Sequence, residues 1–76
     1  MKEMIETIAR ALVDQPDAVS VTEINGAYTS IIELRVAKED IGKIIGKQGR
    51  TVDALRTLLH ALSSKAKTRS RLEIID

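Results

Sequence analysis

Hydrophobic residues at the start of the chain recur at the spacing of an amphipathic helix. The residues of this stripe are Met1, Ile5, Ile8 and Leu12, which are separated by four, three and four positions. Pro16 follows shortly after them, and its ring prevents a helix from continuing. The pattern therefore predicts a first helix that ends near Asp14.

Two segments with the character of strands follow this helix. β-Branched residues dominate from Ala18 to Ile24, and side chains alternate in character from Tyr28 to Val36. The residues on one face of the second segment are Tyr28, Ser30, Ile32, Leu34 and Val36. Asn25-Gly26 lies between the segments and favours a two-residue hairpin turn.

This turn also predicts how the two strands pair. With Ile24 opposite Ala27, Val21 lies opposite Ser30 and Val19 lies opposite Ile32. Both valines then share a sheet face with Ile32, so the turn and the hydrophobic pattern agree.

A short helix is predicted next, from Lys38 to Ile45. Its inward residues are Ile41, Ile44 and Ile45. Glu39 and Asp40 fall in its first turn, where the helix dipole favours acidic side chains. Gly46 is the expected stop of this helix.

The chain then predicts a longer helix and a last strand. The helix extends from Arg50 to about Lys65, and alternation from Ser70 to Ile75 indicates the strand. The apolar stripe of the helix contains Val52, Leu55, Leu58, Leu59 and Leu62. The predicted order of elements is helix, strand, strand, helix, helix, strand.

Length and composition favour a single small domain over residues 1–76. A chain of 76 residues buries roughly 60% of its unfolded surface, which is enough for one thin core. The sequence has no cysteine, so disulfides and thiolate metal sites are excluded. No segment resembles a signal peptide or a membrane span. We therefore expect a soluble cytoplasmic protein without a membrane partner.

The net charge of +1 conceals a strong asymmetry along the chain. Residues 1–40 contain four basic and eight acidic residues, whereas residues 41–76 contain eight basic and three acidic residues. The formal charges of the two parts are thus −4 and +5. Positive charge on the second part favours an anionic partner.

The basic part contains a glycine-rich turn, Gly46-Lys47-Gln48-Gly49, between the two predicted helices. Two glycines three positions apart permit a tight turn with no Cβ in the way of a ligand. The free amides at the start of the following helix can bind an anion. Walker A and dinucleotide-binding glycine patterns do not match this sequence. The turn therefore predicts contact with a phosphodiester backbone.

The segment Ile44-Ile45-Gly46-Lys47-Gln48-Gly49-Arg50-Thr51-Val52 resembles the signature of K-homology (KH) domains, and the preceding Ile41-Gly42 strengthens the likeness. The order of elements resembles the type II KH arrangement over essentially the whole chain. This resemblance implies an α+β fold with a three-stranded sheet and three helices on one face. Residues 1–24 would be the family-specific helix and strand, and residues 28–76 the core with its loop at 46–49.

The resemblance also implies a function, which is non-catalytic binding of single-stranded RNA. In KH domains this loop clamps the backbone of about four nucleotides. The residues implied to bind RNA are Ile41, Gly42, Lys43, Ile44, Gly46, Lys47, Gln48, Gly49, Arg50, Arg56, Lys67 and Arg69. Of these, Ile41 and Ile44 would form the floor on which bases rest. A role as a post-transcriptional regulator or RNA chaperone is implied, as is pairing with a second copy or with a larger KH-containing RNA-binding protein.

Two groups of these residues have an alternative explanation. Gly42 lies inside a predicted helix, where glycine costs roughly 1 kcal/mol relative to alanine. Close approach of a nucleotide or packing against the next helix would each explain it. The basic residues Lys65, Lys67, Arg69 and Arg71 would border the far side of the groove, or serve only as solubilising charge.

The remaining features exclude several functions. Tyr28 is the only aromatic residue, so RNA-binding classes that depend on aromatic platforms do not fit. His60 is the only histidine and shares the exposed side of its helix with Asp53 and Ser64, so we predict no catalytic residue, metal site or cofactor. A helix-turn-helix that reads duplex DNA and a protein-interaction module remain as alternatives. The second would use the outward sheet residues Ile24, Ile31 and Ile75 as a dimer patch.

Overall fold

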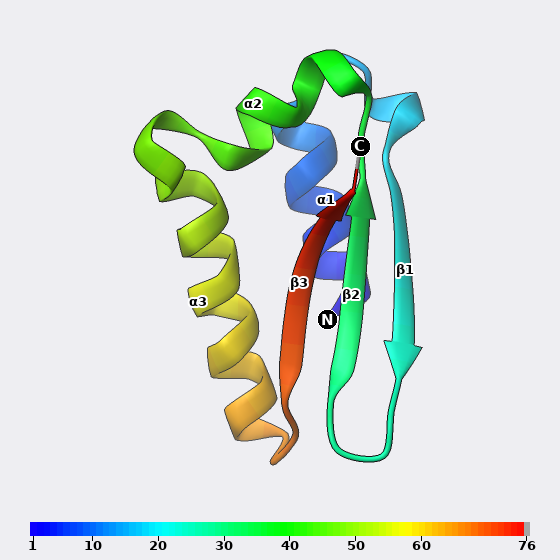
Figure 1. Cartoon of the computed structure of the whole chain (residues 1–76), viewed down its shortest axis with the longest axis vertical. Coiled ribbons are helices and arrows are strands. Elements are labelled where there is room, and N and C mark those ends of the chain that lie inside the picture. Colours follow the sequence, from blue (N-terminus) through cyan, green and yellow to red (C-terminus); the bar gives the residue numbers. More distant parts are fainter. Residues whose placement is uncertain (76) are drawn as a thin grey trace.

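The computed structural model describes residues 1–75, which form three α-helices and a three-stranded sheet (Figure 1). The helices are α1 (Lys2–Leu12), α2 (Ile41–Ile45) and α3 (Arg50–Lys65), and the strands are β1 (Ser20–Asn25), β2 (Ser30–Arg35) and β3 (Ser70–Ile75). Three single 3-10 turns connect them: η1 (Pro16–Ala18), η2 (Lys38–Asp40) and η3 (Lys47–Gly49). The predicted order of elements is confirmed.

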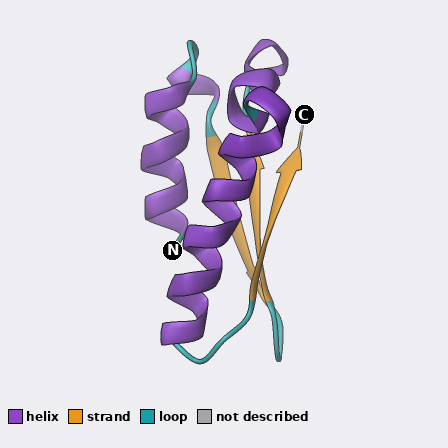
Figure 2. Ribbon diagram, turned by 90° about the vertical axis from the view of Figure 1, so that its left-hand side faces the viewer, coloured by secondary structure: helices purple, strands orange, loops and turns teal. Residues whose placement is uncertain are grey.

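The central strand of the sheet is β2. It pairs antiparallel with β1 and parallel with β3, so the strand order is β1-β2-β3. The helices lie on one side of the sheet and leave its other face uncovered (Figure 2). This α+β arrangement confirms the fold that the KH resemblance implies.

The core lies between the sheet and the helices. Its fully buried large side chains include Ile5 of α1, Ile32 and Leu34 of β2, Ile44 of α2 and Leu59 of α3. One apolar cluster thus holds the layers together, and it includes Ile44 of α2 and Val52 of α3 on the two sides of the turn between these helices.

The hairpin between β1 and β2 differs from the prediction. Asn25 pairs with Ser30 and Ile24 with Ile31, so the loop has four residues, Gly26–Thr29, and the predicted pairing of Ile24 with Ala27 is wrong. A hydrogen bond from Ser30 Oγ to Asn25 Oδ1 (2.8 Å) closes this longer loop. Tyr28 lies in the loop and is 89% exposed.

The predicted assignment of side chains to the buried face is nevertheless correct, because the observed partner of Ile24 lies four positions beyond the predicted one. An even displacement returns each side chain to the same face of a sheet. Val21 accordingly lies opposite Leu34 instead of Ser30, and both remain buried.

The predicted helix stripes are also narrower in the structure. Leu12, Leu58 and Leu62 are each about two-fifths exposed or more, at 39%, 47% and 40%. Ala9 is buried in α1, and Ser63 is buried in α3, where its hydroxyl donates to the Leu59 carbonyl at 2.8 Å. A helix that covers only one edge of a small sheet buries a narrow seam, so the flanking leucines face water.

Asp40 lies at the N-terminal end of α2 as predicted, but it also has a structural role that the sequence did not indicate. Its carboxylate is buried and accepts hydrogen bonds from the backbone amides of Asp14 (3.3 Å) and Gln15 (3.0 Å). These bonds tie the segment after α1 to the start of α2. Within residues 1–75, no helix has the length and apolar character needed to cross a membrane.

Candidate nucleic-acid interface

The turn between α2 and α3 depends on its two glycines. Gly46 ends α2 with φ of 77°, and Gly49 begins α3 with φ of 73°. A Cβ on Gly46 would overlap Thr51 and lie 2.9 Å from the Thr51 backbone nitrogen, whereas a Cβ on Gly49 would meet nothing within 4 Å. Gly46 is therefore required both by conformation and by space, and Gly49 by conformation alone.

The two residues between the glycines project into solvent. Lys47 and Gln48 are both exposed, and Gln48 has a left-handed φ of 58°. This conformation is disfavoured for residues that carry a Cβ. The turn thus holds two long polar side chains away from the core, as the sequence predicts for a backbone-binding loop.

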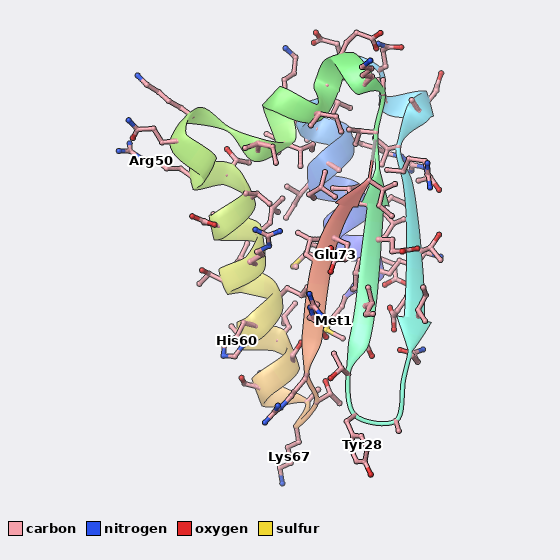
Figure 3. The ribbon with its side chains drawn as sticks, in the orientation of Figure 1. Met1, Tyr28, Arg50, His60, Lys67 and Glu73 are labelled. Atoms are coloured by element: carbon pink, nitrogen blue, oxygen red, sulfur yellow. The ribbon has the colours of Figure 1, made fainter. Side chains whose placement is uncertain are left out.

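The start of α3 has no side-chain cap, although the amides of Gly49 and Arg50 donate within the turn to the carbonyls of Gly46 (3.1 Å) and Lys47. Gly49 at the N-cap offers no side chain to cap the helix, so the first amides of α3 have no side-chain partner there. Arg50 is the first residue of α3 and projects outward at that end of the helix (Figure 3). The positive end of the helix dipole and a guanidinium together form a suitable environment for an anion.

Helix α2 supplies an open surface next to this turn. Gly42 is exposed, and a Cβ added to it would meet nothing within 4 Å. Helix packing therefore does not explain this glycine. Lys43 is half-exposed and lies 3.4 Å from an Asp14 carboxylate oxygen.

The predicted floor of the groove needs a correction at Ile44. Its side chain is 0% exposed and belongs to the core, so it offers no surface to a base. Ile41 and Ile45 are only partly buried and pack on that core. Of the two predicted floor residues, only Ile41 can thus reach a ligand, together with Ile45, because Ile44 is buried in the core.

A channel lies between α3 and β3. Its first part, which we call the near hollow, has a volume of about 390 Å³ and is lined by Arg56, His60, Arg71, Leu72 and Glu73 among others. The Arg56 guanidinium donates from Nη2 to the Leu72 carbonyl at 3.3 Å, which fixes it across the channel. Arg71 and Glu73 form an ion pair at 3.2 Å. The near hollow is therefore polar, with a net excess of positive charge.

Lys67 and Arg69 lie at the opposite end of α3 from the glycine turn (Figure 3). The 16 residues of α3 span about 24 Å at 1.5 Å per residue. The structure therefore brings together the residues from Ile41 to Arg50, with Arg56 further along α3. It does not bring Lys67 and Arg69 to the turn.

The predicted RNA-binding set includes only Arg56 among the residues of the near hollow, and it lacks the ionisable side chains of His60, Arg71 and Glu73. His60 lies one turn beyond Arg56 on the same face of α3, and Arg71 and Glu73 alternate with Leu72 on β3. The i, i+4 and i, i+2 spacings could have identified them. Among residues 1–75 there is no group of three or more potential metal ligands.

The sequence is similar to one family of known proteins. A family model described as "KhpA/KhpB, KH domain" matches residues 2–74. The chain belongs to this KH-domain family. Its relatives include proteins named "RNA-binding protein KhpA" from Caldanaerobacter subterraneus subsp. tengcongensis (59% identical) and Clostridium acetobutylicum (52%), each over 99% of this chain and 100% of the relative.

A third relative with the same name comes from Treponema pallidum and is 56% identical over 99% of this chain and 94% of its own length. No solved structure matches the chain. The family and its relatives thus cover the turn, α2 and the α3–β3 channel together.

Proposed function

We propose that this protein binds single-stranded RNA without catalysing a reaction on it. The observation that carries the proposal is the turn at Gly46–Gly49, which joins two left-handed glycines to the uncapped start of α3. The side chains of Lys47, Gln48 and Arg50 add further hydrogen-bond donors at the turn. A KH loop of this kind clamps the backbone of about four nucleotides.

The open surface around Gly42 favours α2 as the place where the bases bind. With no side chain there and no neighbouring atom within 4 Å of a Cβ, a base can approach the backbone of α2 closely. Ile41 and Ile45 offer partly exposed aliphatic surface on either side. The bases would thus rest on aliphatic groups, while the turn and Arg56 contact phosphates.

The relatives support RNA as the ligand, since the proteins that match over the full chain are named as RNA-binding. We extend this to a role in the cytoplasm as an RNA chaperone or post-transcriptional regulator. The family description joins two proteins, KhpA and KhpB. This favours pairing with a larger KH-containing protein, or with a second copy, as part of the function.

The uncovered sheet face favours a second candidate function, that of a protein-interaction module. Ile24 is 47% exposed and pairs directly with Ile31 on the outer face, where Ile75 also lies. Self-association through this face would appear as a mass that rises with concentration in analytical ultracentrifugation. RNA binding and self-association are separate measurements, so each function can be tested alone.

The decisive experiment is a titration with a short single-stranded RNA and with a duplex DNA of matching sequence. We expect micromolar affinity for the RNA, near −8 kcal/mol, and weak salt-sensitive binding of the duplex. Stronger binding of the duplex would instead support the helix-turn-helix alternative. The double variant Lys47→Asp/Gln48→Asp should abolish RNA binding, because it places two carboxylates beside the phosphates.

A matched control changes the charge equally at exposed positions outside the site. Lys38→Asp/Thr7→Asp does so in η2 and α1. This control should bind RNA with nearly the affinity of the parent. Equal affinity of the loop variant and the parent would remove the clamp, whereas loss of the helical circular-dichroism signal would show that the loop residues are structural.

A further inference from the structure

We propose that the channel between α3 and β3 ends in a second subsite for the RNA backbone, beyond the nucleotides clamped at the glycine turn. This inference rests on the proposed function and extends it from about four nucleotides to about eight. The subsite would hold phosphate and ribose groups. Its cations are Lys67 and Arg69, in the segment that follows α3, and Arg71, at the start of β3.

The first observation is that the channel is continuous. Beyond the near hollow lies a second one of about 520 Å³, which we call the far hollow. The two hollows share His60, Ser70 and Arg71. A third hollow of about 210 Å³ beside the β1–β2 loop shares Thr29, Thr68 and Arg69 with the far hollow. A strand that enters beside Arg56 can therefore follow one path to the end of the molecule.

The second observation is the chemistry of the far hollow. Its lining consists of Arg69, Arg71, His60 and the hydroxyl side chains of Thr29, Ser64, Thr68 and Ser70. His60 supplies the one ring of this lining, and every other side chain in it carries a guanidinium or a hydroxyl group. Guanidinium groups and hydroxyls are the usual partners of phosphate and sugar oxygens. Hydroxyls can also bond the ribose 2′-OH, which distinguishes RNA from DNA.

The third observation is the position of Lys67. The amide of Lys67 donates to the Ser64 carbonyl at 3.1 Å, and the amide of Thr68 donates to the Ser63 carbonyl at 2.8 Å. These two bonds form a Schellman motif at the end of α3, with Lys67 at the position where glycine is preferred. Lys67 accordingly has a φ of 60°.

A lysine is thus retained at a position that disfavours any side chain. Basic residues near a helix C-terminus also stabilise the helix dipole, but Lys65 in the last turn already provides this interaction. Lys67 lies beyond that turn and lines the third hollow together with Arg69. Placement of a cation at the end of the channel explains its presence there.

The length of α3 sets the size of the binding site. The helix has 16 residues and is about 24 Å long. Stacked nucleotides advance roughly 3.4 Å each along one strand, so about seven are needed to cover this distance. An RNA of about four nucleotides that is held at the turn does not reach the far hollow, whereas a longer RNA can contact both places.

The experiment compares two lengths of RNA on the full chain. Fluorescently labelled, randomised-sequence pools of four and of eight nucleotides are titrated against the parent and against Lys67→Gly/Arg69→Gln. The expected loss of affinity for the octanucleotide pool is at least about fivefold larger than the loss for the tetranucleotide pool. Comparison at equal length cancels the larger number of binding registers on the longer RNA. Lys38→Gln removes one exposed charge outside the channel and should change neither affinity.

Folding is controlled within the same variant. Because glycine suits the left-handed conformation, Lys67→Gly alone should raise the thermal midpoint while it weakens octanucleotide binding. Equal losses at both lengths, or no loss at either, would overturn the second subsite and leave the clamp intact. Failure of the parent to bind either pool would instead overturn the proposed function, and this inference with it.

Discussion

Gly46 and Thr51 are packed so closely that no side chain fits between them. A Cβ on Gly46 would overlap the Thr51 side chain, and the φ of 77° at Gly46 disfavours every residue except glycine. Gly49 has a similar φ of 73° but faces open space. The two glycines of the turn therefore differ in what they tolerate, although they are equivalent in the sequence motif.

This difference predicts unequal losses of stability for two substitutions. Gly46→Ala should lower the free energy of unfolding by about 2–3 kcal/mol, since it adds both strain and overlap. Gly49→Asn should lower it by less than about 1 kcal/mol, because asparagine tolerates a left-handed conformation. Urea denaturation followed by circular dichroism measures both. Equal losses would show that space around Gly46 does not matter.

Substitutions at Gly42 should change the stability of the protein and its affinity for RNA independently. Since its surroundings are open, Gly42→Ala should stabilise α2 by about 0.5–1 kcal/mol. Gly42→Val should change stability only modestly, because the β-branched penalty offsets part of that gain. Its affinity for RNA should nevertheless fall sharply with an unchanged salt dependence, because the substitution blocks bases and leaves phosphate contacts intact. Normal RNA affinity in the valine variant would place the bases elsewhere.

The salt dependence of tetranucleotide binding should be moderate. Two or three phosphate contacts at the turn give a slope of log affinity against log salt of roughly −1.5 to −2, at about −0.7 per contact for single strands. Fluorescence titrations over a range of potassium chloride concentrations provide the slope. A value near zero would mean that the basic residues only keep the protein soluble.

Glu73 is the acidic side chain in the near hollow, and it holds Arg71 at 3.2 Å. Glu73→Gln removes a negative charge from the channel and releases this arginine. RNA affinity should rise by about twofold to fivefold, and stability should change by less than about 0.5 kcal/mol because the ion pair is largely exposed. A fall in affinity would indicate that the carboxylate accepts a hydrogen bond from a base.

Loss of the Asp40 carboxylate should affect the stability of the protein alone. Asp40→Ala removes the acceptor of two backbone amides, which should cost about 1–3 kcal/mol. The neighbouring Glu39→Ala loses only an exposed bond to Gln15 Nε2 (3.2 Å) and should change stability by less than about 0.5 kcal/mol. Chemical denaturation of both variants compares them directly. A similar small effect for both would show that the amides find other partners.

Much of the fold was predictable because the relevant signals are local. The bounds of α3 and β3 agree with the predicted Arg50–Lys65 and Ser70–Ile75, since Gly49 marks the start of α3 and hydrophobic periodicity marks both elements. The hairpin register was not predictable, because Asn25-Gly26 favours a two-residue turn that the Ser30–Asn25 hydrogen bond replaces with a longer loop.

The candidate site likewise has some features that the sequence predicts and others that it does not. The turn at Gly46–Gly49 follows from a short motif, so the sequence alone identified it. The burial of Ile44 and the distance of Lys67 and Arg69 from the turn depend on how α3 lies along β3. Such relations join segments that are far apart in the chain, and no local pattern encodes them.

The parallel pairing of β2 with β3 has a consequence for the order in which the binding surface forms. β3 supplies one wall of the channel, yet it follows the glycine turn and all of α3 in the chain. A nascent chain that has emerged from the ribosome only as far as α3 contains the predicted RNA-binding loop but lacks the strand that forms one wall of the channel. Capture of RNA along the full channel must therefore wait until β3 has emerged and docked beside β2, so a growing chain is not expected to hold RNA as the finished protein does.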